Sequence, residues 1–163
     1  MNFPILSSLI LLPTVGSIFI LFGKSSSNYN SAKYISLFIS IGNFILSLYL
    51  WYLFDKNISD FQFVEERIWL DGFINYKVGI DGISILFIIL TTFITSICVI
   101  SVNSSIKHRL KDFLAAILFM ETMMIGVFCS LDLVIFYLFF EAGLIPMFLI
   151  IGIWGGSRRV YSA

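Results

Sequence analysis

The sequence contains few charged residues. Asp, Glu, Lys and Arg make up only 12% of its 163 residues, whereas an ordinary soluble domain carries about 25%. Its ten basic and ten acidic residues cancel, so the net charge gives no reason to expect a nucleic-acid partner. Because 59% of the residues are hydrophobic, the composition excludes an ordinary soluble domain. It predicts an all-α integral membrane protein with little soluble mass.

Residues that usually build metal or nucleotide sites are also scarce. Cys98 and Cys129 lie far apart in apolar stretches, and we expect both to be free thiols. His108 stands alone among basic residues, and the sequence has no glycine-rich nucleotide loop. We therefore expect no metal site. The first apolar stretch has no basic residue before it, so we interpret it as a retained span and not as a signal peptide.

Five apolar stretches are long enough to cross a bilayer as helices. We place them in a single membrane domain, residues 1–163, at about 4–22, 34–54, 82–102, 112–130 and 132–155. Residues 55–80 form the only long loop. Two β-prone runs flank Asp71-Gly72 there, a pattern that favours a β-hairpin, with an irregular loop as the alternative. Asp81 is a candidate N-cap for the third span.

The distribution of basic residues predicts the orientation. Five spans place seven basic residues on one side of the membrane and three on the other. The positive-inside rule then puts the N-terminus and the hairpin loop outside, and residues 103–111 inside. The seven are Lys24, Lys33, Lys107, Arg109, Lys111, Arg158 and Arg159, and the three are Lys56, Arg67 and Lys77.

Glu141 is the most unusual residue of the last apolar stretch. It lies near the middle of a span, where a carboxylate costs roughly 2.5–3.5 kcal/mol on insertion scales. Pro146 follows five residues later and deprives the carbonyl of Ala142 of its helical partner, so a kink is expected just beyond the acid. An ionisable group beside loosened backbone at mid-membrane indicates a functional site.

Glu121 is expected at a similar depth on the neighbouring span. It lies nine residues after Asp112, and Glu141 lies nine residues after Asp132, so each acid is roughly 14 Å from its end of the span. Residues 130–132 allow only a tight turn, which makes the two spans antiparallel neighbours. Such acids can exchange protons; the alternative is that they are protonated residues that hold helices together. No predicted span contains Lys, Arg or His, so we expect another polypeptide to supply any cation for Glu141.

Four motifs resemble the antiporter-like membrane subunits of the proton-pumping NADH:ubiquinone oxidoreductase, respiratory complex I, and among them the subunit 4 family. They are VGIDGIS (78–84), FME (119–121), DLVIFYLFFEAGLIPM (132–147) and IGIWGG (151–156). The resemblance covers essentially the whole chain. It implies the N-terminal part of a fourteen-helix fold, in which Glu141 works with a lysine on a later broken helix and Glu121 is a second relay acid.

The resemblance also implies a setting. The chain is expected to contribute to an H⁺-translocating NADH:ubiquinone reductase in the mitochondrial inner membrane, or in a bacterial plasma membrane. It is expected to carry no cofactor, with NADH, FMN, iron–sulfur clusters and ubiquinone in other subunits. Expected partners are the other membrane-arm subunits and a separate chain with the remaining helices, because the sequence stops where the sixth helix of the family begins.

Two other functions remain open at this point. One is a subunit of a multi-subunit cation/proton antiporter, which resembles complex I in the same segments. The other is a structural or assembly subunit in which the relay residues are vestigial.

Overall fold

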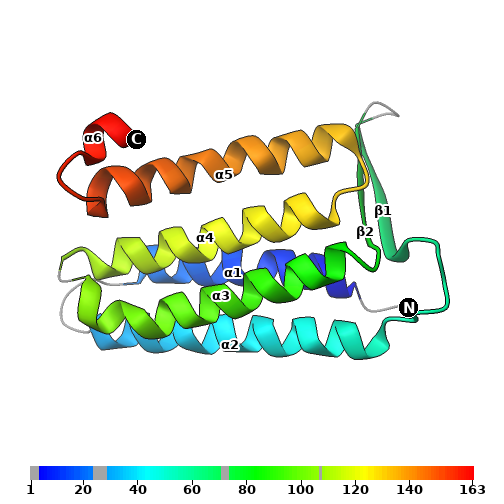
Figure 1. Cartoon of the computed structure of the whole chain (residues 1–163), viewed down its shortest axis with the longest axis horizontal. Coiled ribbons are helices and arrows are strands. Elements are labelled where there is room, and N and C mark those ends of the chain that lie inside the picture. The colour runs from blue at the N-terminus through cyan, green and yellow to red at the C-terminus, as the bar shows by residue number, and fades with distance from the viewer. Residues whose placement is uncertain (1–3, 24–28, 71–73, 107) are drawn as a thin grey trace.

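The structure, a computed structural model, describes residues 4–23, 29–70, 74–106 and 108–163. Five long helices run side by side, and an antiparallel two-stranded hairpin crosses one end of them (Figure 1). All five are long and apolar enough to cross a membrane, which confirms the predicted fold class. The elements are α1 (Ile5–Phe22), α2 (Tyr29–Leu53), β1 (Gln62–Leu70), β2 (Ile74–Ile80), α3 (Ser84–Ser105), α4 (Leu110–Cys129), α5 (Leu133–Trp154) and the short α6 (Arg159–Ser162).

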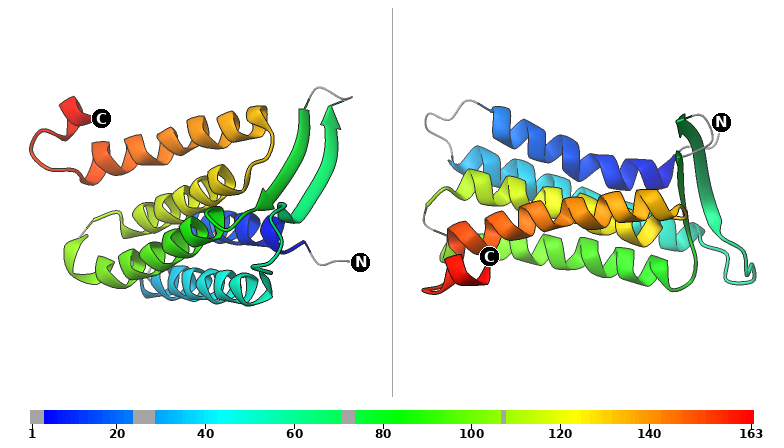
Figure 2. Two further views of the ribbon diagram at one scale, coloured as in Figure 1. Left: turned by 45° about the vertical axis from the view of Figure 1, so that its right-hand side comes forward. Right: turned by 90° about the horizontal axis from the view of Figure 1, so that it is seen from above.

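Helix α4 is the centre of the bundle. It contacts each of the other four long helices and also β2. Helix α5 instead packs mainly on α4, β2 and α6, and it lies along the outside of the bundle (Figures 1 and 2). The chain therefore buries α4 on several sides and leaves most of α5 uncovered.

The helix ends differ from the hydropathy boundaries by a few residues. Helix α2 begins at Tyr29 instead of residue 34, because Ala32 packs against a buried cluster and continues the helix into polar sequence. The predicted loop 103–111 is shorter, since α3 continues to Ser105 and α4 begins at Leu110. Hydropathy marks only the part of a helix that suits hydrocarbon. The Asp71-Gly72 turn lies outside the described residues.

The hairpin is fastened to the start of α1. The carboxylate of Glu65 accepts hydrogen bonds from the backbone N–H of Leu6, at 3.0 Å, and from the backbone N–H and hydroxyl of Ser7. A carboxylate at this end also complements the helix dipole. The Tyr76 hydroxyl lies 3.1 Å from Ser7 Oγ, and burial raises the pKa of Tyr76. The N-terminus of α1 and the hairpin thus share one end of the bundle; which face that is in a membrane stays a prediction.

The hairpin also holds the turn between α4 and α5. The backbone N–H of Leu131 donates to the carbonyl of Lys77 at 2.9 Å, and Ser130 forms a bridge with Val78. A Cβ on Gly79 would lie 2.7 Å from the Leu131 side chain, so the first glycine of the VGIDGIS motif allows this close approach. Asp132 is the N-cap of α5, and its carboxylate accepts hydrogen bonds from the backbone N–H groups of Val134 and Ile135.

The predicted N-cap of α3, Asp81, is not at the capping position, which is Ile83, because a turn of two residues separates Asp81 from the helix. Helix α3 starts at Ser84, and the Asp81 carboxylate accepts hydrogen bonds from the N–H groups of Ile83 and Ser84. The Ser84 hydroxyl donates to the same carboxylate at 2.7 Å. These hydrogen bonds, chiefly those from Ser84, hold the pKa of Asp81 below its usual range.

Candidate functional site

The bundle interior consists of two apolar clusters with a polar layer between them. The first cluster, at the hairpin end, comprises Ile5, Leu6, Leu9, Ile10, Leu50, Val78, Ile80, Ile85, Ile88, Ile125 and Cys129. The second cluster, toward the other end, comprises Ile20, Val99, Val102, Leu114, Ala115 and Leu118. The polar layer comprises Thr14, Ser17, Ser40, Asn43, Ser47, Thr92, Ser96, Glu121 and Thr122, all buried except the partly buried Thr14.

Hydrogen bonds across the polar layer join helices that are distant in sequence. Thr14 on α1 meets Thr122 on α4 at 2.8 Å between their hydroxyl oxygens. Ser47 on α2 meets Thr92 on α3, also at 2.8 Å. Most of the other hydroxyls donate to backbone carbonyls, as Ser and Thr commonly do in membrane helices. These hydrogen bonds satisfy the hydroxyl groups of the layer, whereas Glu121 and Asn43 each keep one oxygen without a partner among the described residues.

Glu121 is the acid of this layer. It is only 1% exposed, and its Oε1 accepts a hydrogen bond from Asn43 Nδ2 at 2.9 Å. Within the described part of the chain, its second oxygen, Oε2, has no hydrogen-bond partner, and neither has Asn43 Oδ1. Both of the salt bridges that the described residues form lie elsewhere, at Lys77–Glu66 and Arg109–Asp112. The prediction that Glu121 is a relay acid stays a prediction, but its burial at mid-helix is clear.

Glu141 has a different environment on α5. Its side chain is exposed, and among the residues that the structure describes no hydrogen bond or ion pair reaches it. Only Ile135 and Pro146 are buried on this helix, which continues through Pro146 to Trp154. Its uncovered face carries large apolar side chains, as a face that meets lipid or other helices does. The structure therefore presents Glu141 outward and does not bring it to Glu121.

Two close contacts give the relative depth of the acids. A Cβ on Gly126 would meet the Phe139 ring at 2.4 Å, and one on Gly143 would lie 3.5 Å from Met123 Cβ. These pairs place Glu121 opposite residues 144–145 of the antiparallel α5. Glu141 is then three or four residues nearer the hairpin end, or roughly 5 Å at the helical rise.

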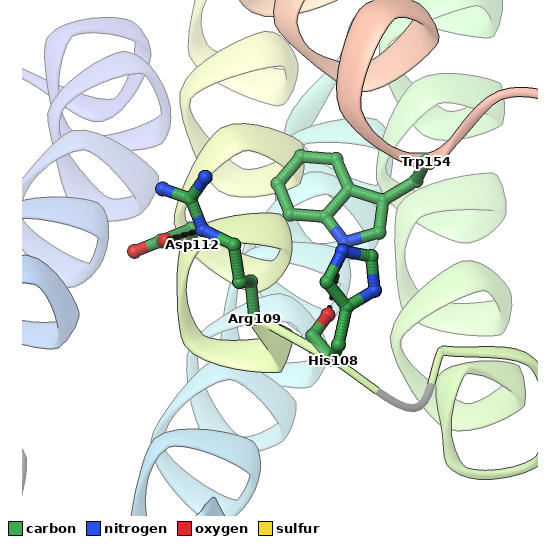
Figure 3. A network of polar contacts seen from close by, with 4 residues as sticks. All are labelled: His108, Arg109, Asp112 and Trp154. Carbon is green, nitrogen blue, oxygen red and sulfur yellow. Dashed lines mark hydrogen bonds and ion pairs between the residues drawn. The ribbon is translucent and has the colours of Figure 1, made fainter.

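The far ends of α4 and α5 are joined as well. Trp154 Nε1 donates to the carbonyl of His108 at 3.1 Å, and Arg109 Nε donates to Asp112 Oδ2 at 2.9 Å (Figure 3). The Trp154 ring also meets Phe113 edge to face, with centroids 5.1 Å apart. The Trp154 contacts and the turn held by β2 therefore join α5 to α4 and the hairpin at both of its ends.

The sequence reasoning missed Asn43. This residue is 0% exposed and is the hydrogen-bond partner of Glu121, although 78 positions separate the two. A search of the spans for cations alone passes over it. A primary amide near the middle of an apolar span was the available signal, because polar side chains at that depth require a partner.

Comparison with known proteins identifies relatives. The family described as NADH:quinone oxidoreductase/Mrp antiporter, TM, matches residues 130–163. NADH-quinone oxidoreductase subunit M of Rhodobacter capsulatus is 50% identical over 141 residues, 86% of this chain and 27% of the relative. NADH-ubiquinone oxidoreductase chain 4 of Marchantia polymorpha is 46% identical over 97% of this chain and 32% of the relative. The corresponding protein of Arabidopsis thaliana is 47% identical, with the same two coverages.

These relatives confirm the resemblance read from the four motifs. The chain spans about a third of the length of the curated relatives it matches.

Proposed function

From its homology to the antiporter-like membrane subunits M and chain 4 of NADH:quinone oxidoreductase, we propose that this chain contributes to proton translocation in such a complex. The observation that carries the proposal is a pair of mid-membrane acids on adjacent antiparallel helices. Glu121 lies in a buried polar layer, and Glu141 lies roughly 5 Å away in depth on an exposed face. Proton exchange is the chemistry that acids at this depth, in these surroundings, support best.

Glu141 is the relay acid that faces the rest of the complex. The uncovered side of α5 requires lipid or further helices against it, and the relatives are about three times as long as this chain. We propose that those further helices, in this polypeptide or in a separate chain, cover Glu141 and supply its cationic partner. A carboxylate at this depth is tolerated only when protonated, hydrated or paired with a cation, so its state can change as the complex turns over.

The redox chemistry of the complex is proposed to lie in other subunits. We propose that NADH, FMN, iron–sulfur clusters and ubiquinone belong to those subunits and that the remaining membrane-arm subunits are the partners of this chain. In this arrangement the chain carries protons and no electrons. The membrane is that of the relatives' respiratory complexes, the mitochondrial inner membrane or a bacterial plasma membrane.

A second function is supported by the family description, which names Mrp antiporters beside NADH:quinone oxidoreductase. In that case the same two acids would exchange protons for another cation. The polypeptides that co-purify with the chain in mild detergent separate the two proposals. NADH-oxidising iron–sulfur subunits support the complex I assignment, and their consistent absence supports the antiporter.

The direct test is Glu141→Gln in the assembled complex. The substitution keeps the side-chain volume and removes the exchangeable proton, so coupled pumping and quinone-linked NADH oxidation should nearly vanish. Electron transfer to artificial acceptors should remain, because that chemistry lies elsewhere. Proton translocation in vesicles is measured and normalised to the amount of assembled complex. The control is Glu66→Gln, an exposed acid of the hairpin whose pumping should equal the parent's. An unchanged proton-to-electron ratio in Glu141→Gln would favour the structural role.

A further inference from the structure

The contact between Glu121 and Asn43 joins two buried polar side chains through a single hydrogen bond. Asn43 Nδ2 donates to Glu121 Oε1 at 2.9 Å, and both side chains are fully enclosed. Each side chain keeps one oxygen, Glu121 Oε2 and Asn43 Oδ1, for which the described residues offer no donor. With an ionised carboxylate, both of these oxygens are acceptors only. An unmatched buried acceptor costs about 1–3 kcal/mol, so two of them in one contact require an explanation.

Among the residues that the structure describes, no cationic side chain forms an ion pair with Glu121. Helices α1 and α3 contain no charged residue, and Glu141 is the only one on α5. Lys33 on α2 lies ten positions before Asn43, roughly 15 Å along the helix. The remaining charges of α4, Lys111 and Asp112, lie in its first turn. A buried carboxylate without a cation is strongly disfavoured, which leaves the neutral acid.

We propose that Glu121 is protonated in the resting protein and that Asn43 is the positioning residue that holds it. The acid and the amide then form two antiparallel hydrogen bonds. Asn43 Nδ2–H donates to Glu121 Oε1, and Glu121 Oε2–H donates to Asn43 Oδ1. One proton on Glu121 Oε2 makes this oxygen a donor and gives Asn43 Oδ1 its missing hydrogen bond, so both oxygens are satisfied. The side chains are planar and complementary, so the pair also orients the carboxyl group.

The pair gives Glu121 a defined resting state. Its proton is held between two groups and is released only when the hydrogen bonds to Asn43 open. This role in proton exchange rests on the proposed function, whereas the pairing itself does not depend on turnover. Asn43 acts through Glu121 and is therefore a positioning residue, not a catalytic one.

Infrared difference spectroscopy of the purified complex at neutral pH tests the pairing. The parent minus Glu121→Gln should show the C=O stretching band of a protonated carboxylic acid, because ordinary carboxyl groups are ionised at this pH. Asn43→Leu should move that band to higher frequency, since the C=O group loses its N–H donor. Ser47→Ala is the matched control: it removes a buried hydrogen bond one turn away on α2 and should leave the band in place.

Two further variants keep the test decisive if Asn43→Leu does not assemble. Asn43→Ser retains a small polar side chain, like the other buried serines of α2, and should shift the band as Asn43→Leu does. Asn43→Gln restores a carboxamide and should return the band toward its parental position. The absence of any acid band that depends on Glu121 overturns the proposal, and so does a band that ignores every Asn43 substitution.

Pumping measurements on the same variants separate the two claims. A Glu121 acid band that shifts with Asn43, together with normal pumping by Glu121→Gln, supports the pair and refutes its part in the relay. Loss of pumping by Glu121→Gln without an acid band supports the relay and refutes the pair.

Discussion

Helices α4 and α5 are adjacent, antiparallel and joined by a tight turn, yet they bury very different fractions of their surfaces. Helix α4 buries eight residues, including Glu121, and α5 buries only Ile135 and Pro146. The glutamates lie roughly 5 Å apart in depth, so depth alone does not determine their environments. The neighbouring helices determine them: α4 contacts four other long helices, whereas α5 contacts one long helix, α4, and the short α6. Two acids on adjacent helices of one chain therefore have different surroundings, one inside the bundle and one on an exposed face.

Because their surroundings differ, substitutions of the two acids test different parts of the structure. Glu121 already has its hydrogen-bond partner inside the described structure, so substitutions there test the packing of this segment. Glu141 has none among the described residues, so substitutions there test what covers α5 in the complex. The following predictions separate the two cases.

The largest effect is expected when the two glutamine substitutions are compared in pumping. Glu141→Gln should lose nearly all coupled proton translocation, and Glu121→Gln should lose less, because glutamine can still pair with Asn43. Glu141→Asp should retain part of the activity, since the acid remains on a shorter side chain. Vesicle proton uptake per assembled complex gives the ranking. Equal losses at both positions would contradict the distinction drawn from their environments.

A substitution at the contact between the helices should have the next largest effect. Gly126→Ala places a methyl group 2.4 Å from the Phe139 ring, and such overpacking costs up to about 3 kcal/mol. Gly143→Ala is the matched control, because its nearest neighbour would lie at an ordinary 3.5 Å. The midpoint of thermal unfolding of the purified complex is measured. A Gly143→Ala variant that melts below Gly126→Ala would show that the helices approach each other differently.

Apolar replacement should distinguish the acids in stability. Glu121→Leu leaves Asn43 buried without its partner, at a cost of about 2 kcal/mol. Glu141→Leu removes no hydrogen bond of this segment and should leave its folding nearly unchanged. The measurement is the fraction of the protein that resists protease when membranes containing it are treated with a low concentration of denaturant. The contrast fails if Glu141→Leu is the less stable of the two.

The smallest effect is expected at an acid of a span end. Asp81 has a lowered pKa because of its hydrogen bonds with Ser84, so its ionised form stabilises the folded state. This contribution is present above the ordinary aspartate pKa and disappears as the pH falls through the lowered value. Asp81→Asn should therefore weaken the dependence of unfolding on acidic pH, followed by denaturation at pH 2 to pH 6, roughly spanning that range. A pH profile equal to the parent's would contradict this assignment.

The sequence predicted the helices well because long apolar runs specify membrane spans. It also predicted the hairpin, since β-prone runs surround a turn signal. The unequal exposure of Glu121 and Glu141 could not be predicted in the same way. Helix α5 is apolar on every side, so no periodic pattern shows which face the chain covers.

Contacts between distant segments account for the rest. Glu65 lies 59 positions from Leu6 and accepts a hydrogen bond from its backbone N–H. In the sequence, a carboxylate in a predicted loop resembles an ordinary surface residue. Asn43 and Glu121 are similarly distant and meet only when α2 packs on α4. Single positions indicated that these groups needed partners, but only the packing of the helices identifies which ones.

The polar layer between two apolar clusters also has an electrical consequence. Each cluster is an apolar layer of low dielectric constant, and the two layers lie on either side of Glu121 along the helix axis. A carboxyl near the middle of α4 therefore senses roughly half of the voltage across the membrane. Moving a proton between that carboxyl and either face is worth about 1.2 kcal/mol for every 100 mV, half the value for a full crossing. Because an apolar layer lies on each side, the membrane voltage can bias the position of the proton that Glu121 carries.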